Sequence, residues 1–329
     1  MKIVIVGGVA GGASAAVRAR RLSETAQIIV LERGEYASFA NCGLPYHIGG
    51  EIPQRDSLLL RTPQDFRQRF NVEVRVRHEV LSIDPQGKTV EVRDSASGKT
   101  YRESYDRLLL SSGAAPLVPP LPGATSPGVF TLRSINDMDA ILAHIAARAP
   151  QHATVVGGGF IGLEVAEALR QRGLAVTLLE MGPQVMMPVD GEMAVPLHQT
   201  LRRHGVDLRL RTALQAIAAD GEGMALTLSD GSVLQSGLVI MAIGVRPESR
   251  LAQDAGLALG ASGGIWVDSA MHTSAADIYA VGDAVEAPPF DDAMPPLVPL
   301  AGPANRIPCW GVTAATAVAR RRRCVRSLI

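Results

Sequence analysis

The order of apolar and polar positions along the chain predicts two copies of a strand–turn–helix–strand unit. Residues 2–22 read KIVIVGGVAGGASAAVRARRL, an apolar β-branched run followed by a glycine turn and a helix rich in small residues. Residues 153–173, ATVVGGGFIGLEVAEALRQRG, repeat that order, and each copy leads to a second apolar strand that closes on an acid, Glu32 or Glu180. This pattern is typical of βαβ nucleotide-binding units, so we expect an α/β fold with two Rossmann-like domains.

The pattern between and after these copies indicates that the second domain is inserted in the first. Residues 71–94 alternate polar and apolar side chains around a Pro-Gln-Gly turn, which predicts a β-hairpin. Prolines accumulate from 116 to 127, and a predicted strand at 238–243 stops at a glycine, so both places are expected to be crossings between domains. The expected division is a first domain of residues 1–114 and 247–306, a second domain of residues 115–246, and a basic tail of residues 307–329.

The second glycine turn fits the GxGxxG pattern with Gly157, Gly159 and Gly162. The tight turn, the approach of backbone to a pyrophosphate and the helix–strand contact each need a residue without a side chain. The helix N-terminus then faces the phosphates, and Glu180, about 20 residues on, is placed to accept hydrogen bonds from a ribose. A dinucleotide site is therefore expected here.

The first glycine turn departs from the pattern at one position. Gly7 and Gly12 take the first and third glycine positions, but Val9 occupies the second. The neighbouring Gly8 and Gly11 keep the backbone accessible, and Glu32 again follows at a distance that suits a ribose diol. We expect a dinucleotide here too; the alternative is a glycine turn that only packs a strand on a helix.

Two further positions carry candidate chemistry. Cys42 lies within YASFANCGLPYHIGG, at the start of a predicted helix, where exposed backbone N–H groups favour thiolate over thiol. The alternative for Cys42 is a small buried hydrophobic residue. In DIYAVGDA, residues 277–284, a short strand breaks at Gly282, so Asp283 is expected either in the ligand crevice of a parallel sheet or as a helix cap.

The composition indicates that the binding partners of this chain are small molecules. The 329 residues are 47% hydrophobic, and 32 Lys and Arg balance 32 Asp and Glu, so neither nucleic acid nor a membrane surface is expected as a partner. The first apolar run is too short for a signal peptide, and no apolar stretch could span a bilayer. The three cysteines, at 42, 309 and 324, form neither a disulfide framework nor a metal-ligand spacing, which indicates a cytoplasmic protein.

With two dinucleotide units and SFANCGLPY after the first, the chain resembles the FAD-dependent pyridine nucleotide–disulfide oxidoreductases over residues 1 to about 306. The match is to their single-cysteine branch of coenzyme A-disulfide reductases, coenzyme A-dependent persulfide reductases, and NADH oxidases and peroxidases. The resemblance implies that NAD(P)H reduces FAD, which reduces the catalytic Cys42. It implies FAD contacts at Gly7, Gly8, Gly11, Gly12, Glu32, Arg33, Asn41, Val80, Ser112, Gly113, Gly282 and Asp283, and NAD(P)H contacts at Gly157, Gly159, Phe160, Ile161, Gly162, Glu164, Glu180 and Gly244.

The electron acceptor separates the members of this branch. A single cysteine forms either a mixed disulfide with a small thiol or a sulfenic acid. The oxidases and peroxidases usually carry a histidine where this chain has Ala10, which favours coenzyme A disulfide or persulfide here. The resemblance implies coenzyme A contacts on one face of the first helix and beyond it, at Ser14, Arg18, Arg21, Ser38, Asn41, Asn305 and Arg306.

Alternatives to this function remain open at the level of sequence. One is an NADH oxidase or peroxidase, and another is a non-catalytic flavin-binding or interaction protein in which the basic tail matters. The arginine run of that tail either binds acidic partners or is a solvated tail. For the pyridine nucleotide, Glu180 and the lack of arginine in residues 181–188 favour NADH over NADPH.

The resemblance stops after GPANR, residues 302–306. Members of the branch continue with an interface domain that builds a homodimer and completes the active site. No such pattern follows here, so the sequence predicts a missing interface domain and a truncated chain that turns over poorly.

Overall fold

The computed structural model describes residues 1–221, 223–288 and 304, which divide into two compact units. Unit 1 comprises residues 1–39 and 61–114 together with the described residues from Pro247 on. Unit 2 comprises residues 40–60 and 115–246. The sequence pattern also places divisions at 114 and 247, but it assigns residues 40–60, which carry Cys42, to the first domain; in the structure they cluster with the second.

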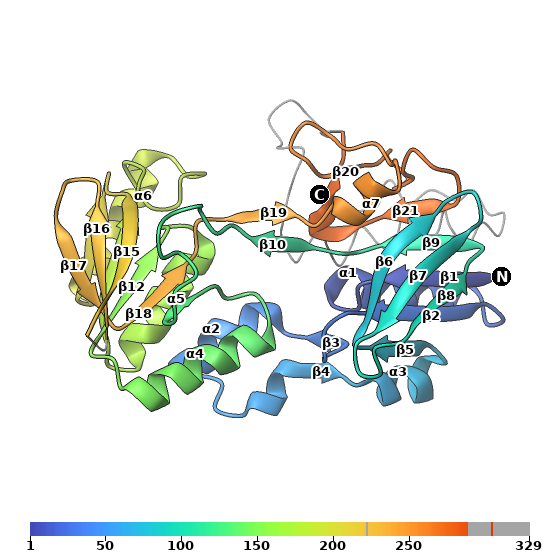
Figure 1. Cartoon of the computed structure of the whole chain (residues 1–329), viewed down its shortest axis with the longest axis horizontal. Helices are drawn as coiled ribbons and strands as arrows, with labels where there is room; N and C mark the ends of the chain where they lie inside the picture. The colour runs from blue at the N-terminus through green and yellow to red at the C-terminus, as the bar shows by residue number, and fades with distance from the viewer. Residues whose placement is uncertain (222, 289–303, 305–329) are drawn as a thin grey trace. The chain divides into compact units, whose positions relative to one another are not determined.

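Unit 1 is built on a five-stranded parallel sheet (Figure 1). All of its neighbours pair in parallel, so the carboxyl ends of the strands lie at one edge, where ligands bind in sheets of this kind. The central strands are almost wholly buried: the successive residues Val4 and Ile5 point to opposite faces of the sheet, and both are fully buried. In sheet order the strands are β21 (Ile278–Ala280), β9 (Arg107–Leu110), β1 (Lys2–Val6), β2 (Gln27–Glu32) and β5 (Glu73–Val76).

Further elements of unit 1 surround this sheet. The predicted hairpin is confirmed in β6 (His78–Asp84) and β7 (Thr89–Asp94), which pair in antiparallel register. Its expected start is wrong, because residues 73–76 form β5 and join the parallel sheet instead. The remaining elements are α1 (Ala10–Leu22), β3 (Ser38–Phe39), α3 (Pro63–Phe70), β8 (Thr100–Ser104), α7 (Arg250–Asp254), β20 (Ile265–Trp266), η3 (Gly282–Ala284) and β22 (Val285–Glu286).

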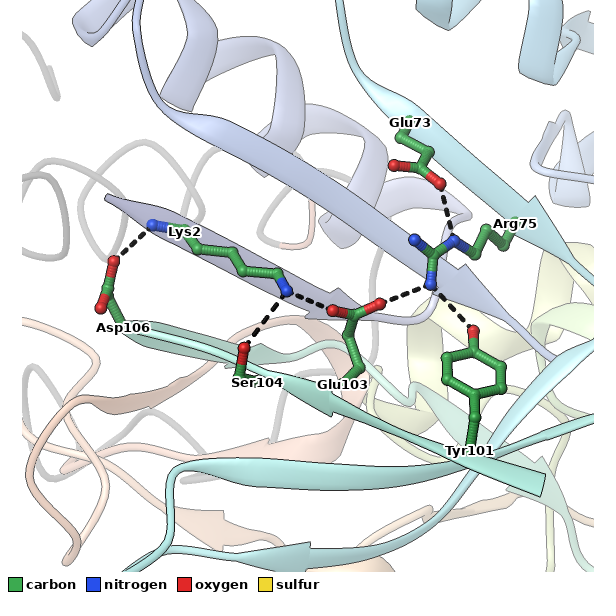
Figure 2. Close-up of polar contacts among 7 residues, drawn as sticks. All are labelled: Lys2, Glu73, Arg75, Tyr101, Glu103, Ser104 and Asp106. Carbon is green, nitrogen blue, oxygen red and sulfur yellow. Dashed lines mark hydrogen bonds and ion pairs between the residues drawn. The ribbon is translucent and has the colours of Figure 1, made fainter.

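A partly buried polar network joins three strands of unit 1 (Figure 2). Glu103 on β8 pairs with Lys2 on β1 and, at 2.5 Å, with Arg75 on β5. Arg75 also donates to Glu73 at 2.7 Å and to the Tyr101 hydroxyl at 2.9 Å. Burial acts to raise the pKa of Glu103, but the hydrogen bonds from Lys2 and Arg75 outweigh it and hold that pKa below its usual value.

Unit 2 repeats the architecture with a second five-stranded parallel sheet. The predicted strand at 238–243 ends earlier, at Met241, before Gly244 turns the chain with φ 120°. In sheet order the strands are β11 (Val129–Phe130), β18 (Leu238–Met241), β12 (His152–Val156), β13 (Ala175–Glu180) and β14 (Val206–Leu210). Its other elements are α4 (Ile135–Arg148), α5 (Phe160–Gln171), α6 (Gly191–Arg203), the antiparallel β15 (Leu214–Asp220), β16 (Gly223–Leu228) and β17 (Val233–Ser236), and most of the paired β10 (Ala114–Pro116) and β19 (Val245–Pro247).

Residues 40–60 are held against α4 and α5 of the same unit. They form η1 (Asn41–Gly43), α2 (Leu44–Gly49), η2 (Arg55–Leu58) and most of β4 (Leu59–Arg61). Helix α2 packs on α5 so closely that a Cβ on Gly49 would lie 3.2 Å from the Ala168 Cα. Arg172 donates to the Ile48 carbonyl, and Arg55 makes a two-point contact with Asp139 on α4, at 2.9 and 2.7 Å.

Candidate functional site

The first glycine turn, between β1 and α1, is held by contacts that exclude side chains. Gly7 has φ 93°, and a Cβ there would lie 2.2 Å from the Ser111 carbonyl oxygen. A Cβ on Gly12 would lie 1.8 Å from the Gly7 oxygen, and one on Gly11 would lie 2.5 Å from the Ser111 hydroxyl. These glycines therefore bring β1, α1 and the loop after β9 together at the carboxyl edge of the sheet.

Val9, which replaces the second glycine of the pattern, is the N-cap residue of α1. Among the described residues no side chain hydrogen-bonds to this helix end, and the first turn of α1 carries no acidic side chain. The amide groups of that turn are therefore available to an anion such as a pyrophosphate.

Glu32, at the carboxyl end of β2, fixes the other side of this turn. Its carboxylate accepts hydrogen bonds from the amides of Gly8 and Gly34, both at 2.7 Å, and the residue is only 8% exposed. Each carboxylate oxygen keeps a further lone pair, which can accept from a ribose hydroxyl.

Loops after β9 and β21 complete the same edge. The Ser111 amide donates to the Val6 carbonyl at 2.8 Å, and the Val281 amide donates to the Leu110 carbonyl at 2.9 Å. Each loop therefore begins with a hydrogen bond to the neighbouring strand. The Ser112 hydroxyl donates to the Glu248 carbonyl at 2.6 Å. Asp283 lies within η3, whose N-cap is Val281, so Asp283 is not the cap of that helix.

The remaining residues of unit 1 that are expected to contact FAD or coenzyme A lie on several different elements. Arg33 is exposed and pairs with Glu248 at 3.0 Å, while the side chain of Val80 on β6 packs against the core. Ser14, Arg18 and Arg21 all lie on α1; Ser14 and Arg18 are half-buried and Arg21 is exposed. Within the described part of the chain, the buried Nε of Arg18 has no hydrogen-bond partner. Ser38 is half-buried in β3.

The second glycine turn, between β12 and α5, has the same construction in unit 2. Gly157 has φ 109°, and a Cβ on it would lie 2.4 Å from the Ala242 oxygen; a Cβ on Gly162 would lie 1.9 Å from the Gly157 oxygen. Gly159 differs, because no described atom lies within 4 Å of its would-be Cβ. Gly159 is the N-cap of α5, whose first turn carries no acid, so its open face is a place for a phosphate.

Glu180 occupies the position in unit 2 that Glu32 occupies in unit 1. It accepts from the amide of Gly158 at 2.7 Å and from that of Gly182 at 2.6 Å. Phe160 and Ile161, at the start of α5, are 58% and 37% exposed. Glu180 can accept from a ribose, and the exposed apolar side chains can contact a flat ring system.

Cys42 lies exposed in η1, which leads into the six-residue helix α2. Its exposure excludes the alternative of a small buried hydrophobic residue. The hydrogen-bonding groups around Asn41 fix its amide: the nitrogen donates to the Arg133 carbonyl at 2.8 Å, and the oxygen accepts from the Arg133 guanidinium. The sequence pattern carries no signal for Arg133, because this contact depends on how α4 is placed against residues 40–60.

Tyr46, on α2, is a second residue that the sequence analysis missed. The charge of Glu164 is the largest cause of a raised pKa for the Tyr46 phenol, with burial, Glu167, Glu51 and Cys42 contributing further. Burial, followed by the charge of Glu167, raises the pKa of Glu164 itself. Glu164, expected among the NAD(P)H contacts, thus lies near Glu167 and near the Tyr46 phenol, which in turn is close to Cys42.

Some expectations fall outside the described residues, namely those on Asn305 and Arg306 and on the tail. Within the described ranges there is neither a group of three or more residues suited to a metal ion nor a helix long and apolar enough to cross a membrane.

The sequence and the fold of this chain are similar to those of known reductases. A coenzyme A disulfide reductase of Staphylococcus aureus (strain JH9) is 36% identical over 305 residues, which are 93% of this chain and 68% of that protein. The structure of reduced Bacillus anthracis CoADR-RHD matches with a TM-score of 0.93 and 49% identity over 96% of this chain. An NAD-dependent persulfide reductase from A. fulgidus matches with a TM-score of 0.93 and 34% identity over 97% of this chain.

The chain spans 56% of the B. anthracis chain and 60% of the A. fulgidus chain. The family model described as pyridine nucleotide-disulphide oxidoreductase matches residues 1–305. This chain, with its two glycine turns and their paired acids, belongs to the pyridine nucleotide-disulphide oxidoreductase family.

Proposed function

We propose that this chain is a flavoprotein oxidoreductase that passes electrons from NAD(P)H through FAD to Cys42, and from Cys42 to coenzyme A disulfide or persulfide. The observation that carries the proposal is the duplicated nucleotide cradle, in which Glu32 and Glu180 hold equivalent glycine turns. Relatives named for coenzyme A disulfide and persulfide reduction support the choice of acceptor.

The first turn fits FAD. The uncapped first turn of α1 would hold the pyrophosphate and Glu32 the ribose, and the loops with Ser112, Gly113, Gly282 and Asp283 would provide further contacts to the cofactor. Bound FAD supplies two-electron chemistry between a hydride donor and a thiol–disulfide couple.

The second turn fits NAD(P)H, and within that class NADH. Glu180 would accept from the 2′-hydroxyl of NADH and repel a 2′-phosphate. No arginine follows in residues 181–188 that could neutralise such a phosphate. The open face of Gly159 leaves room for the pyrophosphate at the start of α5.

Cys42 supplies the thiol chemistry. Its thiolate attacks one sulfur of coenzyme A disulfide, the S–S bond breaks, and one coenzyme A thiolate leaves and takes up a proton. Two electrons from NAD(P)H then reduce the Cys42–coenzyme A mixed disulfide and release the second thiol. Ala10 supplies no acid–base group for a sulfenic acid cycle.

The second candidate is an NADH oxidase. A water-forming NADH oxidase from Lactobacillus brevis, bound to NADH, matches with a TM-score of 0.89 and 30% identity over 96% of this chain and 69% of that chain. Oxygen consumption by the NADH-reduced protein, with no thiol added, distinguishes this candidate. A non-catalytic flavin-binding role is distinguished by its survival in a Cys42→Ser variant.

The decisive experiment compares Cys42→Ser with the matched control Cys309→Ser. We expect Cys42→Ser to lose NADH-dependent reduction of coenzyme A disulfide by about 100-fold or more, since the nucleophile is gone. NADH-dependent reduction of ferricyanide, which needs only the bound flavin, should stay within about 2-fold, and Cys309→Ser should change neither rate. Undiminished disulfide reduction by Cys42→Ser, or protein that takes up no FAD, would refute the proposal.

A further inference from the structure

The residue next to Cys42 is held by a partner distant in sequence. Asn41 makes two hydrogen bonds to Arg133, one to the backbone oxygen and one from the guanidinium. Because the two bonds use both ends of the Asn41 amide, the side chain has one orientation. The backbone beside it is also fixed, since the Ala40 amide donates to Leu58 at 2.8 Å and the Gly43 amide to Ala40 at 2.9 Å.

Arg133 is itself anchored at the start of α4. The carboxylate of Asp137 accepts from the amides of Arg133 and Ser134, both at 2.9 Å, and the Ser134 hydroxyl accepts from the Asp137 amide at 3.2 Å. This capping box fixes the backbone that carries Arg133. The N-terminus of α4 therefore fixes the backbone of Arg133, and Arg133 in turn holds the Asn41 side chain.

We propose that Arg133 is a positioning residue that acts through Asn41 to set the direction of the Cys42 thiol. The inference rests on the proposed role of Cys42. Attack on a disulfide requires the incoming sulfur to lie in line with the bond that breaks, so a small displacement of Cys42 slows exchange with a bulky disulfide. A small alkylating reagent approaches an exposed thiol from many directions and is much less sensitive to that displacement.

The test compares two reactions of Cys42 in a Cys309→Ser, Cys324→Ser background, so that Cys42 is the one thiol in the sequence. One reaction is mixed-disulfide formation with coenzyme A disulfide, and the other is alkylation by iodoacetamide, both followed by intact mass. We expect Arg133→Met to slow disulfide exchange about 10-fold and alkylation less than about 2-fold. Equal slowing of both reactions, or no slowing of either, would overturn the inference.

A second variant separates geometry from charge. Arg133→Lys keeps the positive charge, but its ammonium group is not placed where the guanidinium N–H donates to the Asn41 oxygen. We expect it to lose disulfide exchange nearly as much as Arg133→Met, and it keeps the test open if the methionine variant does not fold. Full wild-type exchange by Arg133→Lys would show that charge alone is needed and would overturn the positioning role.

Two controls complete the design. In an Asn41→Ala background, Arg133→Met should have almost no further effect, because residues that act as one unit are not additive. Arg55→Met removes a different arginine contact, the one from η2 to Asp139 on α4. It should lower the melting temperature but leave the ratio of the two Cys42 rates unchanged.

The same design keeps the two proposals apart. Both exchange and alkylation are measured without NADH or turnover, so they report on Arg133 even if Cys42 is not the electron acceptor. The proposed function is tested separately: undiminished NADH-dependent reduction of coenzyme A disulfide by Cys42→Ser would refute it and would leave the two thiol rates as a test of Arg133.

Discussion

Glu32 and Glu180 accept the same pair of backbone hydrogen bonds in two different units. Each takes one amide from a glycine turn, Gly8 or Gly158, and one from the glycine two residues beyond itself, Gly34 or Gly182, at 2.6 to 2.7 Å. Hydrogen bonds to an ionised carboxylate are stronger than neutral ones, so each acid fixes its turn before any ligand arrives. The two cradles are thus preorganised by the same device.

Glu180→Gln tests this device in unit 2. The amide keeps one acceptor but turns an N–H₂ group toward Gly158 or Gly182, and it removes the charge that opposes a 2′-phosphate. We expect the Kd for NADH to rise about 10-fold and the preference for NADH over NADPH to shrink, as measured by fluorescence titration. The matched variant Glu32→Gln should weaken FAD retention and leave NADH affinity unchanged; an unaltered nucleotide preference in Glu180→Gln would contradict the assignment.

Gly159→Ala separates binding from folding. The backbone of Gly159 is extended, and no described atom would meet its new Cβ, so the melting temperature should stay within about 2 °C. The methyl group would occupy the face assigned to the pyrophosphate, and we expect NADH affinity to fall about 10-fold or more. Gly162→Ala is the contrast, because its Cβ would lie 1.9 Å from the Gly157 oxygen and should impair folding itself. Unchanged NADH binding by Gly159→Ala would count against a phosphate at that position.

Glu164→Gln should make the Tyr46 phenol more acidic. The charge of Glu164 is the main cause that raises the pKa of Tyr46, so its removal moves the ionisation to lower pH, toward the ordinary value of 10.0. Ultraviolet difference titration near 295 nm measures the change, with Tyr46→Phe used to identify the signal. If the titration curve did not move, the phenol and the acid would not be neighbours in solution.

Glu103→Gln should destabilise unit 1 in a pH-dependent way. The folded-state pKa of Glu103 lies below its usual 4.5, so its contribution is present above about pH 4.5 and is lost as pH falls through the folded pKa. At pH 7 the variant leaves Lys2 and Arg75 without their shared partner, and we expect a loss of about 2 kcal/mol in the free energy of unfolding.

Urea unfolding at pH 7 and pH 3 measures this effect, and the difference between variant and wild type should shrink at the lower pH. Glu79→Gln, which removes an exposed ion pair with Arg93, should cost less than about 1 kcal/mol at either pH. An equal loss at both pH values in Glu103→Gln would exclude the ionic network as its source.

The sequence predicts the two nucleotide units because their signals are local. Apolar strands, glycines at fixed spacing and a distal acid all act within one βαβ unit, and even Val9 leaves the turn intact as the N-cap of α1. The hairpin over residues 71–94 is only partly predicted, since alternation shows that residues 73–76 form a strand but not which sheet they join.

The surroundings of Cys42 could not be predicted in this way. Asn41 meets Arg133, and Gly49 meets Ala168, through packing between segments far apart in the chain, with no sequence period or motif that links them. The proline-rich stretch at 116–127 marks one crossing, but nothing comparable marks residue 40 or residue 60.

Because residues 40–60 pack on α4 and α5, they determine which fragments of this chain can fold independently. A fragment of residues 115–246 alone would lack α2, so the side of α5 that Ile48 and Gly49 cover would be exposed to water. A stable excised version needs both stretches, for instance with residues 40–60 grafted through a short linker. Chimaeras between relatives should exchange the two stretches as a pair.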